Sequence, residues 1–329
     1  MQSVEETNEG DDRLPWVEKY RPKNFTDIVS QQWIIETLDR FLVKDQWPHL
    51  LFYGPPGVGK TSTINAACQM IYGTTSSPMI LELNASDARG IDVVRNTIKD
   101  FASTRAMFSD KFKLVILDEV DSMTNTAQFA LRRIIENYTK HARFCLICNE
   151  VSQIIPALQS RCTRFRFSPL EPALALEKAR EIAVAEHMTF EDDALSILCD
   201  VAGGDMRRVL NVMQAISMTR VPLTEGSVFA TMGRPHPNLV NELLQRLLQS
   251  DAIDGLQYLD ENIIKQGFSL EDIVPLLHDL VLPVEMPSTQ HALILTGLAD
   301  IQYQLTQAST PSLQSAALVG LFQRMRSAV

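Results

Sequence analysis

The sequence lacks several features that mark large classes of protein. It contains no run of 18 apolar residues, so we expect no membrane-spanning helix and no membrane among its partners. Its five cysteines are few and odd in number, which argues against a disulfide framework and favours a reducing, intracellular compartment. Glycine and proline supply 14 and 16 of 329 residues, beside 45% hydrophobic residues, so collagen-like and wholly disordered chains are excluded.

Metal-binding and redox patterns are also missing. The six histidines are scattered and show no H-E-x-x-H spacing. Cys145 and Cys148 have the C-x-x-C spacing of zinc and redox sites, but no second cysteine or histidine pair follows at a useful distance. Both fall in an apolar run that predicts a buried strand, whereas a redox pair would stand at the start of a helix. We therefore interpret these two cysteines as core residues.

Positive charge is scarce in the chain as a whole. The 40 acidic and 30 basic residues give a net charge of −10, which by itself disfavours binding to a polyanion. The charge is uneven, because residues 1–13 carry a net −4, residues 14–167 a net +4 and residues 168–329 a net −10. A polyanion would therefore have to bind the front of the chain.

The sequence predicts an acidic tail, an α/β domain and two helical domains. Residues 1–13 are polar without an apolar period, and we expect them to be disordered. Residues 14–167 alternate short apolar runs with stretches of helical spacing, which predicts a three-layer domain with a parallel sheet. The predicted strands are 50–53, 80–83, 114–117, 144–147 and 164–167, and the predicted helices are about 60–71, 91–104 and 125–140.

The strand pattern ends near Pro169. Helical spacing over 172–187, 191–201, 205–219 and about 224–232 predicts a small helical domain over residues 168–233. Residues 234–237 read Arg-Pro-His-Pro and are a candidate linker. Residues 234–329 are expected to form a further all-helical domain.

A phosphate-binding motif follows the first predicted strand. Glycines let backbone N–H groups curl around phosphates, the lysine meets the β and γ charges, the hydroxyl binds Mg²⁺, and the next helix points its positive end at the polyanion. The position of the motif between a predicted strand and a predicted helix favours phosphate binding over a chance glycine-rich turn. The motif G-x-x-x-x-G-K-[ST] is formed by Gly54, Pro55, Pro56, Gly57, Val58, Gly59, Lys60 and Thr61, with Ser62 after it.

Two carboxylates end the third predicted strand. Asp118 and Glu119 follow the apolar run Leu114–Leu117, and Asp121 comes two residues later. Ligands gather at the carboxyl ends of strands in open α/β sheets. We expect Asp118 to hold Mg²⁺, partly through water, together with Thr61, and Glu119 to polarise an attacking water. The sequence therefore predicts a site that binds a polyphosphate together with Mg²⁺ and directs a water at it.

These motifs belong to a longer set that resembles a known family. The stretch from about Leu14 to Arg220 is similar to the small subunits of replication factor C, the sliding-clamp loader among the AAA+ ATPases. Residues 144–167 look most like the subunit numbered third in yeast and fifth in human. Val120 stands where several relatives have alanine, which leaves both strand-end acids in place. Besides the motifs above, the resemblance rests on Leu14–Pro22, Leu83–Asp87 with Arg89–Asp92, and Ser160–Cys162.

The resemblance implies an AAA+ α/β ATPase domain with a five-stranded parallel sheet, then a helical lid and an all-α collar for oligomerisation. It assigns roles to residues outside the phosphate-binding motif. Asn149 resembles sensor 1, Arg207 resembles sensor 2 of the lid, and Arg161 resembles an arginine finger that acts in trans on a neighbouring subunit's site. Taken alone, Asn149 could be a turn former, and the two arginines could be solvated. The wall beside the adenine is implied to include Val17, Tyr20, Arg21 and Pro22.

Two contact surfaces are implied as well. Arg89, Arg95 and Lys99 lie on or just before one helix and would contact the phosphate backbone of primer-template DNA without reading bases. Each of them could equally belong to a solvated helix face. The run Met70, Ile71 and Tyr72 falls where relatives contact the clamp, although ordinary packing explains such a run too.

The function implied is that of an ATP-dependent clamp-loader subunit in the nucleus. In a heteropentamer it would bind ATP, open or hold the sliding clamp and place it on primer-template DNA, and hydrolysis would trigger release. One alternative is a nucleotide-binding scaffold subunit without significant hydrolysis, which the intact Glu119 and Arg161 argue against. Another is a different AAA+ DNA machine, such as a helicase loader or a Holliday-junction helicase.

Overall fold

The chain divides into two compact units, and each is described here by itself. The computed structural model describes residues 14–44, 46–73, 78–86, 91–104, 111–307 and 310–327, without the side chains of 91–95 and 311. The acidic tail, residues 1–13, lies outside the described residues. The first unit ends at Leu223 and the second begins at Thr224.

A five-stranded parallel sheet forms the centre of the first unit, as the sequence predicts. The strand order is β2-β3-β4-β1-β5, and all neighbouring strands pair in parallel. β3 and β4 are apolar and buried on both faces, as expected for parallel strands covered by helices on each side. The strands are β1 (Leu50–Tyr53), β2 (Ile80–Asn84), β3 (Lys113–Asp118), β4 (Ala142–Cys148) and β5 (Thr163–Arg166).

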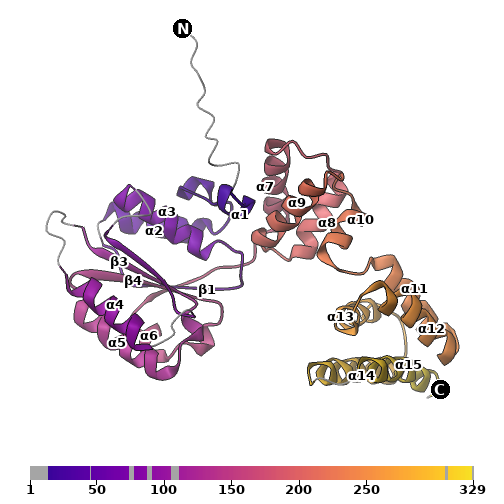
Figure 1. The fold of residues 1–329 in the computed structure, drawn as a ribbon. Helices are drawn as coiled ribbons and strands as arrows, with labels where there is room; N and C mark the ends of the chain where they lie inside the picture. Colours follow the sequence, from indigo (N-terminus) through magenta and orange to yellow (C-terminus); the bar gives the residue numbers. More distant parts are fainter. Residues whose placement is uncertain are drawn as a thin grey trace, which may run out of the picture. The chain divides into compact units, whose positions relative to one another are not determined.

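Helices cover both faces of the sheet (Figure 1). α2 (Gln32–Val43) and α3 (Lys60–Tyr72) lie over one face. α4 (Ile91–Ser103), α5 (Asn125–Tyr138) and the short α6 (Pro156–Gln159) lie over the other. The sequence reading did not assign α2, whose N-cap residue Gln31 has left-handed backbone geometry and no capping side-chain hydrogen bond.

Three helices follow the sheet within the first unit, and we call them the lid helices. They are α7 (Pro172–Ala185), α8 (Asp192–Ala202) and α9 (Met206–Thr219), in agreement with the helical spacing of the sequence. The Asp205 carboxylate accepts a hydrogen bond of 3.1 Å from the Arg208 backbone N–H and so caps α9. The N-terminal helix α1 (Trp16–Lys19) packs against α9.

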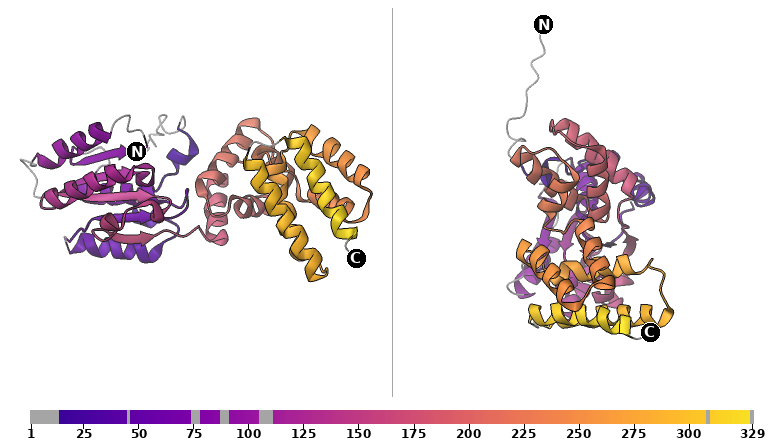
Figure 2. Two further views of the ribbon diagram at one scale, coloured as in Figure 1. Left: turned by 90° about the horizontal axis from the view of Figure 1, so that it is seen from below. Right: turned by 90° about the vertical axis from the view of Figure 1, so that its right-hand side faces the viewer.

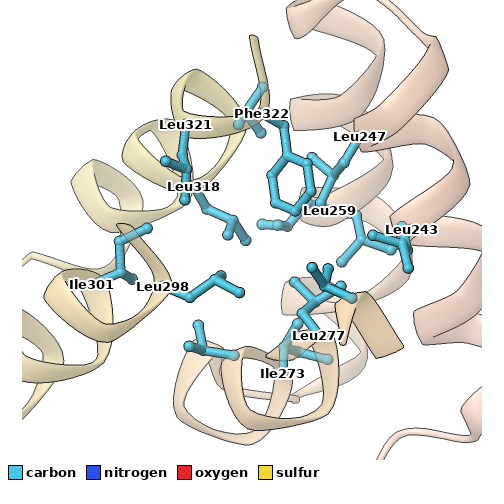
Figure 3. Close-up of a cluster of buried hydrophobic side chains, with 14 of the residues drawn as sticks. Leu243, Leu247, Leu259, Ile273, Leu277, Leu298, Ile301, Leu318, Leu321 and Phe322 are labelled. Atoms are coloured by element: carbon cyan, nitrogen blue, oxygen red, sulfur yellow. The ribbon is translucent and has the colours of Figure 1, made fainter. Parts of the chain in front are cut away.

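The second unit is helical throughout its described part. Its helices are α10 (Glu225–Met232), α11 (Pro237–Gln249), α12 (Ala252–Asn262), α13 (Leu270–Val281), α14 (Ser288–Thr306) and α15 (Pro311–Ser327). α14 and α15 run side by side (Figure 2). Leucines and isoleucines from α11 to α15, together with Phe322, form one buried apolar cluster (Figure 3). This cluster gives the unit a hydrophobic core of its own.

Short 3₁₀ turns lie between the larger elements. η2 (Phe25–Asp27) precedes α2, and η3 (Val120–Ser122) follows β3. η4 (Val151–Gln153) follows β4, and η5 (Ile264–Gln266) follows α12. Within the described ranges, no helix combines the length and apolarity needed to cross a membrane.

The cysteine pair of the C-x-x-C motif is part of the core, as predicted. Cys145 and Cys148 are buried in β4, and both are free thiols. Burial raises the pKa of Cys148 to about 12 and raises that of Cys145 as well. Since a thiol is reactive only as the thiolate, both side chains are chemically inert at neutral pH.

Candidate functional site

One cavity of the first unit collects most of the residues selected from the sequence. Its volume is about 290 Å³, and it lies where the sheet, α1 and the lid helices meet. The carboxyl ends of β3 and β4 contribute to its lining, which is the edge where ligands bind in open α/β sheets. The predicted residues that line it are Val17, Tyr20, Arg21, Pro22, Pro56, Gly57, Val58, Gly59, Lys60, Thr61, Ser62, Asp118, Glu119, Asn149 and Arg207.

Lys60, the first residue of α3, is held in place by its own loop. Its ammonium group donates hydrogen bonds of 2.7 Å to the carbonyl oxygens of Gly54 and Pro55 and one of 3.0 Å to Asn149 Oδ1. Burial lowers the pKa of Lys60, and the nearby Asp118 carboxylate opposes that shift. Gly54 and Pro55 do not line the cavity and serve instead as acceptors for this cation.

Thr61 and Asp118 form an oxygen pair beside Lys60. The Thr61 hydroxyl donates a hydrogen bond of 2.9 Å to Asp118 Oδ2, so the two residues proposed for Mg²⁺ adjoin each other. The other Asp118 oxygen accepts a 2.9 Å bond from the Glu119 backbone N–H. A hydroxyl and a carboxylate are hard oxygen donors, which suits Mg²⁺. The described residues contain no group of three or more His, Cys, Asp or Glu side chains that could hold a metal, so phosphates and water would complete such a site.

Glu119 occupies an unusual backbone conformation. Its φ is 55°, in the left-handed region that a residue with a Cβ seldom adopts, and its side chain is exposed. Such strain is found at functional sites, where the surrounding structure holds the residue against its own preference. The conformation turns the chain at the end of β3, directly beside the oxygen pair.

Asp121 links the end of β3 to the end of β4. Its Oδ2 accepts hydrogen bonds from the backbone N–H groups of Asn149, at 2.8 Å, and Glu150, at 3.1 Å. This fixes the turn that follows β4 and brings the Asn149 amide to Lys60. The third acid of the sequence motif is therefore a structural partner of the candidate sensor.

The lid helices supply cavity residues that the sequence reading missed. Lys178 and Ile182 come from α7, and Met206 and Leu210 flank the predicted Arg207 on α9. Leu170 precedes α7, and the segment Asp27–Ser30 completes the lining near the N-terminus. Lys178 also forms a 2.8 Å ion pair with Glu181 on the same helix. The four-residue spacing of Lys178 and Ile182 shows that they share a helix face, but only the fold shows that this face lines the cavity.

The phosphate-binding loop also contacts the lid directly. A Cβ on Gly57 would lie 1.6 Å from Asp205 Oδ1, the carboxylate that caps α9, and the φ of Gly57 is 72°. Only glycine fits this position, both because of the left-handed φ and because of the close approach.

Arg161 is not among the residues that line the cavity. Its guanidinium forms an ion pair with Glu136 of α5 and donates a hydrogen bond of 2.6 Å to the Ala157 carbonyl oxygen. Arg132 binds the same Glu136 oxygen at 3.2 Å. Desolvation raises the pKa of Glu136, but hydrogen bonds from the two arginines outweigh it and lower the pKa overall.

The candidate DNA and clamp residues come from two segments, around α4 and at the end of α3. Arg89 lies outside the described residues, as does the side chain of Arg95, while Lys99 is exposed on α4. Met70 is 47% exposed near the end of α3. Tyr72 is committed within its own chain, because its hydroxyl donates a 2.7 Å hydrogen bond to the Phe112 carbonyl oxygen and its ring packs edge-on against Phe112. Ile71, the residue between Met70 and Tyr72, is half-buried.

Comparisons with known proteins identify the family. Residues 50–170 match the ATPase family associated with various cellular activities, and residues 235–320 match the replication factor C C-terminal domain. The chain is 45% identical over 317 residues to replication factor C subunit 5 of Mus musculus, covering 96% of this chain and 94% of that protein. The chain belongs to the replication factor C subunit family. Replication factor C subunit 3 of Saccharomyces cerevisiae is 44% identical over 318 residues, covering 94% of this chain and 93% of that protein.

Membership in the replication factor C family confirms the resemblance drawn from the sequence motifs, including the likeness to the fifth mammalian and third yeast subunits. A third relative, the probable replication factor C subunit 5 of Dictyostelium discoideum, is 46% identical over 95% of this chain and 91% of its own length. The RuvB Holliday junction branch migration motor of Thermotoga maritima has a TM-score of 0.54 at 15% identity, over 82% of this chain and 93% of that chain. At that identity it shows a shared fold.

Proposed function

We propose that this replication factor C subunit binds ATP and Mg²⁺ in the cavity and works in a heteropentameric clamp loader. In that assembly it opens or holds the sliding clamp and helps place it on primer-template DNA, and hydrolysis triggers release. The observation that carries the proposal is the meeting of Lys60, Thr61, Asp118 and Asn149 in one cavity that the lid residue Arg207 also lines.

The loop and α3 bind the triphosphate. The backbone N–H groups of residues 56–61 and the positive end of α3 favour a polyanion. Lys60 exchanges its bonds to the loop carbonyls for bonds to phosphate oxygens, which suits a buried cation better than neutral acceptors do. Among the other lining residues, Ile182 and Leu210 offer apolar side chains against which the base packs.

Thr61 and Asp118 hold Mg²⁺, since their oxygens already lie 2.9 Å apart. When bound, the ion supplies positive charge that stabilises the phosphate oxygens of the transition state.

Hydrolysis depends on residues of two subunits. Glu119 orients the attacking water and takes up its proton, and the Asn149 amide, held by Asp121 and Lys60, donates to the γ-phosphate or to that water. Arg161 acts on a neighbouring subunit's nucleotide, and the ion pair with Glu136 keeps its guanidinium on the outer face of this chain. The isolated chain lacks a partner's arginine and hydrolyses ATP slowly.

The remaining proposed partners are DNA and the sliding clamp. Arg89, Arg95 and Lys99 contact the DNA phosphate backbone. This contact is local because the chain as a whole carries a net charge of −10, and it is salt-sensitive because it releases counterions from the phosphates. Among the clamp candidates, Met70 offers the most exposed apolar side chain. A clamp loader of this family acts in the nucleus.

The test is the ATPase rate of the complete complex with clamp and primed DNA. We expect clamp and DNA to stimulate the wild type, and Glu119→Gln in this subunit to reduce its contribution by about 10²–10⁴-fold while ATP still binds. Absence of stimulation in the wild type would reject clamp loading. An unchanged rate with Glu119→Gln would favour a nucleotide-binding scaffold.

A further inference from the structure

The helix α1 is bonded to two lid helices at points 166 and 198 residues away in the sequence. The Tyr20 hydroxyl donates a 2.5 Å hydrogen bond to Glu186 Oε1, at the end of α7. The Lys19 ammonium lies 2.8 Å from the same Glu186 oxygen. The Trp16 backbone N–H donates a 3.1 Å bond to Gln214 Oε1 of α9. Figure 1 shows α1 beside α7 accordingly.

The placement of Glu186 is costly for the helix that carries it. Glu186 is the C-cap residue of α7, where the helix dipole disfavours a negative charge. Its side chain is only 17% exposed, so water screens that charge poorly. The Lys19 ammonium and the Tyr20 hydroxyl compensate it, and both come from α1 and the residue that ends it. A carboxylate here stabilises α7 poorly, but it is well suited to hold Tyr20.

Tyr20 connects this bond to the cavity. Val17, Tyr20, Arg21 and Pro22 line the cavity, whereas Glu186 does not. We call these four residues the base wall. The Glu186 carboxylate therefore acts on the cavity only through the Tyr20 side chain that it holds.

We propose that Glu186 is a positioning residue that fixes the base wall to the lid and thereby sets the affinity for the nucleoside part of ATP. This rests on the proposed binding of ATP in the cavity. The phosphate-binding loop has its own supports, in the Lys60 bonds to Gly54 and Pro55, and none of them involves α1. Loss of the Glu186 carboxylate therefore weakens binding of the nucleoside and leaves binding of the triphosphate group in place.

The experiment compares ATP with inorganic tripolyphosphate, both with Mg²⁺, on the full-length chain by titration calorimetry and competition. Glu186→Gln removes the charge, and Tyr20→Phe keeps the ring and removes only the hydroxyl. Glu177→Gln makes the same charge change at an exposed position of the same helix and is the matched control. Thermal unfolding of each variant shows whether the fold is retained.

We expect Glu186→Gln and Tyr20→Phe each to weaken ATP binding about tenfold, the scale of one charge-assisted hydrogen bond. The double variant should lose less affinity for ATP than the sum of the two single losses, because both changes affect the bond between Tyr20 and Glu186. Tripolyphosphate affinity should stay within about twofold of the wild type in all variants, as should ATP affinity in Glu177→Gln.

If the wild type binds ATP, three outcomes would overturn the proposed role of Glu186 and leave ATP binding in the cavity unaffected. They are unchanged ATP affinity in Glu186→Gln, equal losses for ATP and tripolyphosphate, and additive effects of the two single changes. A wild-type chain that binds neither ligand would overturn ATP binding in the cavity and this proposal with it.

Discussion

Acid should loosen the first unit through His49, a histidine that the fold keeps neutral. His49 is 9% exposed and stands directly before β1. Its Nδ1 accepts a 3.2 Å hydrogen bond from the Phe144 backbone N–H, and its Nε2 lies 3.2 Å from the Thr139 hydroxyl, which donates to the Ile135 carbonyl oxygen. The ring is therefore an acceptor at Nδ1 and a donor at Nε2. A second proton would remove the acceptor of a buried backbone N–H.

Burial, with a smaller effect from Arg143, lowers the pKa of His49 from 6.5 to about 4. The unfolded chain then binds more protons than the folded one between these values, so stability falls as the pH falls. The contribution is fully present above pH 6.5 and is lost progressively toward pH 4. Between pH 7.5 and 4.5 the loss of stability comes to about 2–3 kcal/mol, at ~1.36 kcal/mol per pKa unit.

The assay is urea unfolding across this pH range, with His49→Asn as the matched variant. Asparagine keeps an acceptor near the Nδ1 position and does not titrate. All three tryptophans precede Leu223, so their fluorescence reports on the first unit alone. We expect the wild type to lose about 2–3 kcal/mol more of its unfolding free energy than the variant on acidification. Parallel pH profiles for the two proteins would refute this account of His49.

Three further substitutions test the site, the partner contact and the second unit. Gly57→Ala should weaken ATP binding at least tenfold, because the new Cβ would lie 1.6 Å from the carboxylate that caps α9. The control is Gly73→Ala, at a glycine with a similar φ of 77° and open space around it, which should leave the affinity for ATP unchanged. Arg161→Ala should leave the ATP affinity of its own chain unchanged but reduce turnover at the neighbouring site that it completes about 10³-fold in rapid-mixing assays of the assembled complex. Gly297→Ala should destabilise the second unit by about 1–3 kcal/mol in calorimetry, because the new Cβ would lie 2.3 Å from a buried leucine of α15. The control Gly320→Ala, where nothing lies within 4 Å of the new Cβ, should stabilise the same unit slightly because alanine favours helix more than glycine does.

Much of the sheet could be predicted because its strands are apolar runs bounded by polar residues. β1 begins and ends where the sequence places it, and β3 and β4 extend their predicted strands by one or two residues at each end. α2 was missed because its N-cap, Gln31, has a left-handed conformation in place of a capping side chain. The strand order was not predicted either, since no local pattern specifies which parallel strands become neighbours.

The candidate site could likewise be predicted only in part. The phosphate-binding loop and the acids Asp118 and Glu119 could be predicted because the residues that form each motif are adjacent in the sequence. Lys178 was missed because only the packing of α7 onto the cavity gives it a role. The bond between Tyr20 and Glu186 spans 166 residues, and neither residue carries a sequence signal for the other.

The central claim is that this subunit binds ATP alone but needs a neighbour to hydrolyse it rapidly. The most direct measurement is ATP turnover per active site by the purified full-length chain, before and after assembly with its partner subunits, at saturating ATP and Mg²⁺. We expect tight binding with slow turnover by the monomer and a rise on assembly of about 10³-fold or more. Fast turnover by a verified monomer would contradict the account.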